Sequence, residues 1–140
     1  MSEQQYFAAD QEHEAELSRL KLLEQFFDPT TIRHLEMLHP SEGWNCLEVG
    51  AGAGSVAQWL SKRVGPMGKV LATDMDTRFL NHLSAPNLEI RRHDIIKDDL
   101  ETGRYDLVHC RFLLMHLPEP GKGLKRMANA LRPGGWLLIE

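Results

Sequence analysis

The chain has 140 residues, 42% of them hydrophobic and 26% charged, with a formal net charge of −4, which is typical of one globular domain. The slight acidity and the scattered basic residues argue against a nucleic-acid partner, and no apolar run approaches the roughly 20 residues that span a bilayer. Because the N-terminus is polar and acidic, unlike a signal peptide, and the two cysteines lie far apart, we expect a cytoplasmic protein.

The first 43 residues are predicted to form a helical leader. Leucine and phenylalanine residues recur at spacings of three and four between residues 11 and 27, which is the apolar stripe of an amphipathic helix. At "DPTT" (28–31) we expect this helix to end and a second to begin, with Asp28 as the N-cap and Pro29 in the first turn. The leader is therefore expected to contain two helices.

After Gly43 the chain alternates short apolar runs with helical segments. Each apolar run is bounded by turn residues and is predicted to be a buried strand. The expected strands are 44–49, 69–74, 88–94, 105–110 and 136–140. Helices are expected through Val56 and Val64, over 77–83 and after Pro120. This alternation indicates an α/β fold with a doubly wound, mostly parallel sheet that carries helices on both faces.

"CLEVGAGAGSVA" (46–57) places three glycines within five positions directly after the first expected strand. Glycines adopt backbone dihedrals that a Cβ would forbid, and they let a ligand approach the main chain closely. Within this stretch, "GAGSVA" (52–57) fits the dinucleotide fingerprint, and Asp74 follows at the distance of a ribose-binding acid. Read from Glu48, however, the same stretch is E-x-G-x-G-x-G. The glycines alone therefore leave two cofactor classes open.

The charge of Glu48 distinguishes these two classes. A dinucleotide would place its pyrophosphate over the turn, where a carboxylate at roughly 4 to 6 Å repels it by about a kcal/mol or more. S-adenosylmethionine has no phosphate and carries an ammonium and a sulfonium group, both of which a carboxylate attracts. The acid therefore favours S-adenosylmethionine, and an NAD-type oxidoreductase domain is the less favoured alternative.

Five segments together resemble the class I S-adenosylmethionine-dependent methyltransferases, and within them the broad bacterial group that acts on small molecules. In chain order they are "LEVGAGAGSVA", "VLATDMD", "RRHDI", "YDLVHCRFLLMHLPEP" and "LRPGGWLLIE". The resemblance covers residues 44–140 and implies a Rossmann-like S-adenosylmethionine-binding α/β domain with strand order 3-2-1-4-5, preceded by a helical leader or lid over residues 1–43. It implies transfer of a methyl group to a small-molecule acceptor by in-line displacement, with S-adenosylhomocysteine as the product.

The same resemblance implies a set of residues that bind the cofactor. The glycine turn would wrap the methionine part, through Glu48, Gly50, Ala51, Gly52 and Gly54. The remaining contacts follow the later strands. No metal is implied, since the seven histidines show no metal-ligand spacing.

Asp74 ends the second strand and would accept hydrogen bonds from both ribose hydroxyls, while Met75 would lie against the adenine. Asp94 would receive the exocyclic amine of the adenine, with the Ile95 backbone N–H beside it. Alternatively, Asp94 is a turn residue at the end of a strand. Arg111 occupies a position whose backbone borders the methionine moiety, and its side chain has an ion pair with the acidic residues of the leader as an alternative role.

Three further positions have a functional and a structural interpretation. Asp76 competes with the ribose-binding acid or is a helix N-cap. His116 is a candidate general base near the transferred methyl group, although packing or capping in its loop is the favoured interpretation. Tyr6 and Phe7 belong to the part of the leader that, in the family, folds over the cofactor and helps to form the substrate pocket. A helix that merely covers the sheet is the alternative.

The C-terminus departs from the family pattern. Class I methyltransferases usually follow the fifth strand with a helix and an antiparallel pair of strands six and seven, and these are absent from the sequence. We therefore expect a fragment or a chain that needs a partner, and a non-catalytic cofactor-binding module is the alternative function. The unpaired edge of "WLLIE" (136–140) is expected to drive self-association, with a homodimer as one outcome.

Overall fold

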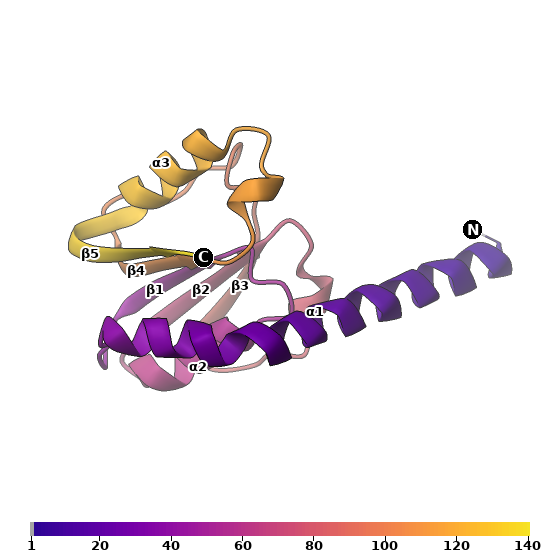
Figure 1. Cartoon of the computed structure of the whole chain (residues 1–140), viewed down its shortest axis with the longest axis horizontal. Helices are drawn as coiled ribbons and strands as arrows, with labels where there is room; N and C mark the ends of the chain where they lie inside the picture. Colours follow the sequence, from indigo (N-terminus) through magenta and orange to yellow (C-terminus); the bar gives the residue numbers. More distant parts are fainter. Residues whose placement is uncertain (1) are drawn as a thin grey trace.

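A five-stranded parallel sheet forms the centre of the molecule in the computed structural model, which describes residues 2–140 apart from the side chains of Tyr6 and Phe7 (Figure 1). The strands are β1 (Asn45–Val49), β2 (Lys69–Asp74), β3 (Leu88–Arg92), β4 (Tyr105–Cys110) and β5 (Leu131–Ile139). They are arranged in the order β3-β2-β1-β4-β5, and every neighbouring pair is parallel. The predicted fold class and strand order are therefore confirmed.

Helices cover the two faces of this sheet. α1 (Glu3–Met37) and α2 (Ser55–Val64) lie on one face, and α3 (Pro120–Ala130) lies on the other (Figure 1). Because side chains alternate along a strand, Cys46 of β1 packs into the core beneath α1 and α2, whereas Leu47 packs into the core that contains Met127 of α3. Within residues 2–140, none of the helices combines the length and the apolar character that crossing a membrane requires.

The leader forms one helix where we expected two. α1 continues without a break through Pro29, although a proline inside a helix removes a hydrogen bond and its ring crowds the preceding turn. The residues that follow are held by tertiary packing, because Thr31 and Leu35 are almost fully buried. Asp28 is not an N-cap, since its Oδ1 accepts hydrogen bonds from Ser55 and Arg111. The contacts with the rest of the domain thus outweigh the local signal to end the helix.

Smaller differences concern the ends of elements. The helix expected over 77–83 is the short 3-10 helix η1 (Thr77–Leu80), for which Asp76 is the N-cap, as the structural alternative predicted. A second 3-10 helix, η2 (Leu114–His116), follows β4. β5 begins before the expected residue 136 because "RPGG" lies inside it, where the pairing with β4 shifts register. The interpretation of Tyr6 and Phe7 falls on side chains outside the described part.

Candidate functional site

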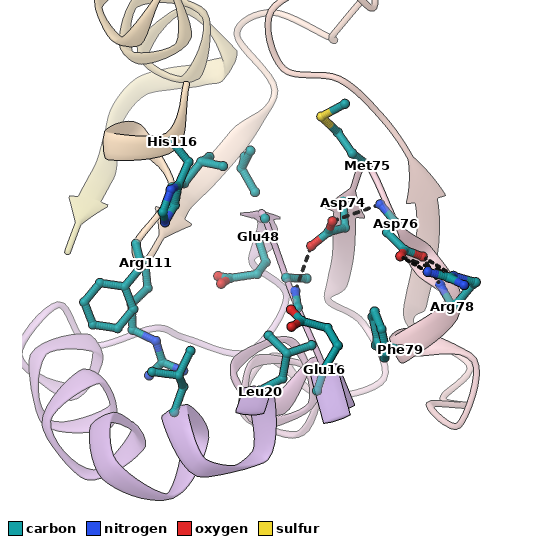
Figure 2. A pocket seen from close by; sticks show the side chains of 18 of the residues that line it. Glu16, Leu20, Glu48, Asp74, Met75, Asp76, Arg78, Phe79, Arg111 and His116 are labelled. Atoms are coloured by element: carbon teal, nitrogen blue, oxygen red, sulfur yellow. Dashed lines mark hydrogen bonds and ion pairs between the residues drawn. The ribbon is translucent and has the colours of Figure 1, made fainter. Parts of the chain in front are cut away.

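A cavity of about 670 Å³ lies where β1, β2 and β4 end and α1 passes beside them (Figure 2). Its size is that of a site for a small molecule or cofactor, and ligands of open α/β sheets bind outside the carboxyl ends of the strands. The cavity is lined by the glycine turn, by the residues after β2, β3 and β4, and by one side of α1. Of the ten proposed cofactor contacts and His116, all but Gly54 line the cavity.

The glycine turn follows β1 and is fixed by backbone hydrogen bonds. The N–H groups of Gly50 and Ala51 both donate to the carbonyl of Thr73 at 2.9 Å. Gly50, Gly52 and Gly54 have φ values of 72°, 60° and 87°, which side chains with a Cβ rarely adopt. At Gly54 a Cβ would also come within 2.2 Å of Leu83. Gly54 therefore serves the packing of the turn, while the other glycines leave the main chain open to the cavity.

Asp74 ends β2 and lies at the opposite side of the cavity from Arg111 (Figure 2). Its Oδ2 accepts a hydrogen bond from the Gly52 N–H at 2.9 Å, and its Oδ1 accepts one from the Asp76 N–H at 3.0 Å. Each carboxylate oxygen has a second lone pair that can accept another bond. Asp74 is thus held in place by the backbone and can still accept from a diol.

Met75 and Asp76, the two positions after Asp74, both line the cavity but differ in their contacts. Met75 is 62% exposed and lies at the rim of the cavity. Asp76 forms an ion pair with Arg78 at 2.7 Å, and the hydrogen bonds from Arg78 lower the pKa of that carboxyl. Because Asp76 is already paired and caps η1, it is the weaker candidate for the ribose.

Asp94 and Ile95 follow β3 and line the same cavity. The Oδ1 of Asp94 accepts a hydrogen bond from the Ile96 N–H at 2.8 Å, and its own N–H donates to Asp98. These bonds belong to a tight turn, as the structural alternative predicted. The turn nevertheless brings the carboxylate to the cavity wall, while the Ile95 side chain is buried in the core.

The Arg111 side chain is directed at the leader. Its Nη2 donates to Asp28 and its Nη1 donates to Thr31, both at 3.0 Å, and it forms the ion pair that the sequence allowed as an alternative. Asp28 also accepts from the hydroxyl of Ser55, the first residue of α2. Arg111 therefore connects the end of β4 to α1, and Asp28 in turn connects α1 to α2.

His116 ends η2 and lines the cavity from the side of β4 (Figure 2). Its ring is exposed, so it is accessible to a ligand in the cavity. From α1, the opposite wall receives Glu16 and Leu20, and His13 stacks on Phe79 with ring centroids 4.6 Å apart. The leader thus forms a wall of the cavity in addition to covering the sheet.

Sequence reasoning missed His109. In the register of β1 and β4 it lies directly beside Glu48, and its Nδ1 is 2.5 Å from the Glu48 Oε2. Its Nε2 is 2.9 Å from the Oε2 of Glu140. Both Glu48 and His109 are the second-last residue of their strands. The signal that could have predicted this contact is that each of two neighbouring apolar strands carries a polar residue at the same distance from its C-terminal end.

Glu140 extends the contact to α1. Its Oε1 is 2.6 Å from the Nδ1 of His34, and its Oε2 accepts from the Thr31 hydroxyl at 2.8 Å. His109 is fully buried, the Glu48 side chain is 4% exposed and the Glu140 side chain 15%. A chain of hydrogen bonds therefore runs from the cavity, across the sheet face, to the partly exposed His34.

The pKa values in this chain shift in directions that follow from burial and charge. Burial lowers the pKa of His109, but the charge of Glu48 and the hydrogen bonds to Glu140 and Glu48 outweigh it and raise the pKa to about 9. Burial raises the pKa of Glu48, against the opposing pull of His109 and Arg111. Burial also acts to raise the pKa of Glu140, but its hydrogen bonds lower it to about 2.

The comparison with known proteins decides the family. The family model described as a methyltransferase domain matches residues 47–137. The chain belongs to this family. Among curated members, methyltransferase str2 of Strobilurus tenacellus is 37% identical over 95 residues, which are 67% of this chain and 34% of that protein. The ubiquinone biosynthesis O-methyltransferase of Hydrogenovibrio crunogenus is 30% identical over 117 residues, which are 81% and 48%.

Solved methyltransferase structures share this fold. A S-adenosylmethionine-dependent methyltransferase from Aquifex aeolicus has a TM-score of 0.73 and 29% identity, with 89% of this chain and 71% of that chain covered. A methyltransferase solved with the Haloferax volcanii Trm112 activator has a TM-score of 0.78 at 20% identity, covering 89% and 56%, and shows the fold alone. The chain spans less than half the length of the two curated relatives.

Proposed function

We propose that the chain binds S-adenosylmethionine in this cavity and is the cofactor-binding part of a methyltransferase that acts on a small molecule. The observation that carries the proposal is the pair of carboxylates on the cavity wall, with Glu48 at the glycine turn and Asp74 at the end of β2. A dinucleotide would place phosphates against these acids, whereas S-adenosylmethionine offers them cationic groups and a ribose diol. Membership of the methyltransferase family supports the same cofactor over NAD.

The proposed contacts fit the geometry of the cavity. Asp74 would accept from the ribose hydroxyls with lone pairs that its backbone bonds leave available. Asp94, with the Ile95 N–H, would receive the adenine edge, and Met75 at the rim would cover the adenine face. Since the Arg111 side chain is held by Asp28 and Thr31, only its backbone remains as a cofactor contact.

The methionine part would occupy the glycine turn beside Glu48. Gly50, Ala51 and Gly52 line the cavity there, and the absence of a Cβ at both glycines allows the ligand to approach the main chain. In-line methyl transfer requires mainly that the acceptor and the methyl group be aligned and water excluded. The wall formed by α1 would contribute to both, and His116 is the residue best situated to accept a proton from the acceptor.

A cofactor-binding module that lacks turnover by itself is the second candidate. The chain spans less than half the length of its curated relatives, so the acceptor pocket of the whole protein is a proposal as well.

We further propose that the outer edge of β5, the end strand of the sheet, pairs with a second copy of the chain. Sedimentation of a monomer at high concentration would contradict this pairing. The buried free thiols of Cys46 and Cys110 fit the reducing cytoplasm that the sequence predicts.

Calorimetric titration of the chain with S-adenosylhomocysteine and, separately, with NADH tests the cofactor proposal. We expect saturable binding of S-adenosylhomocysteine and none of NADH. The variant Glu89→Gln, which alters an exposed ion pair with Arg91 on β3 outside the cavity lining, is the control for unspecific loss of binding. Binding of NADH without binding of S-adenosylhomocysteine would overturn the proposal.

A further inference from the structure

His109 is the only side chain in the described part of the chain that the structure places between two buried or nearly buried carboxylates. Each of its ring nitrogens lies within hydrogen-bond distance of a different carboxylate oxygen, from Glu48 at 2.5 Å and from Glu140 at 2.9 Å. An ionised carboxylate can only accept a hydrogen bond, so each nitrogen must carry a proton. With both carboxylates ionised, the geometry therefore requires an imidazolium at position 109.

With both carboxylates ionised, the three groups together carry one net negative charge. A pair made of Glu48 and the His109 cation alone would be neutral and would attract a cationic ligand weakly. Glu140, on the far side of the ring, restores the negative charge. A lone Glu48 buried as deeply as this would be driven towards its neutral form, and it would then attract a cation no better than an amide does.

Other charged groups face this cluster from each neighbouring element. Arg111, at the end of β4, pairs with Asp28 of α1, so its charge is compensated locally. His34 of α1 bonds to Glu140 and is 44% exposed, so water screens it. The thiols of Cys46 and Cys110 have pKa values raised to about 12 by burial and are neutral near pH 7. The net charge of this buried cluster is therefore set by Glu48, His109 and Glu140.

Resting on the proposed function, we propose that His109 and Glu140 are positioning residues that keep Glu48 ionised at the cavity and bias the site towards the charged cofactor over its product. The sulfonium sulfur of S-adenosylmethionine becomes neutral when the methyl group leaves, because the bonding electron pair stays on sulfur. S-adenosylhomocysteine therefore has one positive charge fewer. A net negative cluster beside the cavity binds the first more strongly, relative to the second, than a neutral cluster would.

The test measures the ratio of the two dissociation constants, for S-adenosylhomocysteine and for S-adenosylmethionine, by calorimetry at pH 7. The variants are His109→Gln, which removes the cation but keeps a polar side chain, and Glu48→Gln, which is isosteric and neutral. For Glu48→Gln we expect the ratio to shift towards S-adenosylhomocysteine by roughly tenfold, as for unit charges about 6 Å apart at an effective dielectric constant near 40. For His109→Gln, in which Glu48 becomes neutral while Glu140 keeps its charge on the far side, we expect a smaller shift in the same direction. A purely structural role would weaken both ligands equally and leave the ratio unchanged.

His34→Gln is the matched control, because His34 bonds to the same Glu140 and lies outside the cavity lining. We expect its ratio to equal that of the wild-type chain. If His34→Gln shifts the ratio as much as His109→Gln, docking of α1 rather than charge is responsible, and the inference is wrong. Unchanged ratios in all variants also overturn it. If His109→Gln does not fold, Glu48→Gln decides alone. A wild-type chain that binds neither ligand would overturn the proposed function itself, and the inference with it.

Discussion

The two carboxylates of the cavity differ in what surrounds them. Asp74 is partly exposed, and both its oxygens accept hydrogen bonds from backbone N–H groups of the chain. Glu48 is buried, and its oxygen faces the ring of His109, which in turn faces Glu140. Backbone donors fix the position of an acid without changing their own charge, whereas a side-chain partner can gain or lose a proton. Asp74 is therefore suited to constant hydrogen bonding and Glu48 to an interaction that depends on charge.

The largest expected effect on stability comes from removing the imidazole ring of His109 beside Glu48. His109→Ala leaves Glu48 and Glu140 without their shared cation, and breaking a buried ion pair costs about 3–5 kcal/mol. Urea denaturation should show this loss in the free energy of unfolding. His93→Ala is the control, because the buried ring of His93 bonds to the backbone carbonyl of Asp99, and its loss should cost about 1–2 kcal/mol. Equal losses would show that packing, not charge, makes His109 important.

The stability of the wild-type chain should fall as the pH rises. The pKa of His109 is raised from 6.5 to about 9 in the folded chain, so its contribution is complete below about pH 6.5 and is lost as the pH rises through about 9. Between these values the free energy of unfolding should decrease by about 1.4 kcal/mol per pH unit, on the order of 3 kcal/mol in total. His109→Gln should lack this slope, and a slope that persists in the variant would assign it to another group.

Asp74→Ala tests the other carboxylate. The loss of two hydrogen bonds to a charged acceptor should weaken S-adenosylhomocysteine by roughly 1.5–3 kcal/mol, measured by calorimetry. Asp74→Asn keeps one acceptor oxygen and should lose less. Since the cofactor and its product share the ribose, neither variant should alter the preference between them. A changed preference would mean that Asp74, like Glu48, acts through charge.

The smallest expected effect concerns the attachment of α1. Asp28→Asn weakens the partly buried ion pair with Arg111 and should reduce stability by about 1 kcal/mol. Compared with the wild-type chain, amide hydrogen exchange in this variant should become faster in the C-terminal half of α1, whereas the exchange rate in β1 should not change. Glu16→Gln, in an exposed pair with Arg19, should change stability by less than about 0.5 kcal/mol. No change in exchange for Asp28→Asn would assign the attachment of α1 to Leu35 and its apolar neighbours.

The features that the sequence predicted correctly are local or repeat along the chain. Apolar runs between turn residues gave the strands, since a central parallel strand such as β1 is buried on both faces. The glycine turn was recognisable because its φ values require glycine at particular positions. The continuity of α1 through Pro29 was not predictable from local preference, because buried residues 31 and 35 maintain it.

The contacts of His109 depend on the register of the sheet. Residues 48 and 109 are separated by 61 positions, and the local sequence around either residue does not predict that the two are in contact. Once the register is known, Glu48 and His109 are forced together, because both side chains must lie on the same face. The interpretation of Glu48 as an attractive group for a cation was made without its partners, and these partners determine whether it is charged.

The length of α1 has a mechanical consequence. Its 35 residues form one helix, attached to the domain near Thr31 and extending past the sheet at its N-terminal end (Figure 1). Glu16, on the cavity wall, lies roughly 22 Å along the axis from Thr31, at about 1.5 Å per residue. For a rigid rod of that length, a tilt of about 10° at the attachment displaces Glu16 by roughly 4 Å. The width of the cavity therefore depends on the angle of α1, which the hydrogen bonds near Thr31 fix at one end and the stacking of His13 on Phe79 restricts at the other.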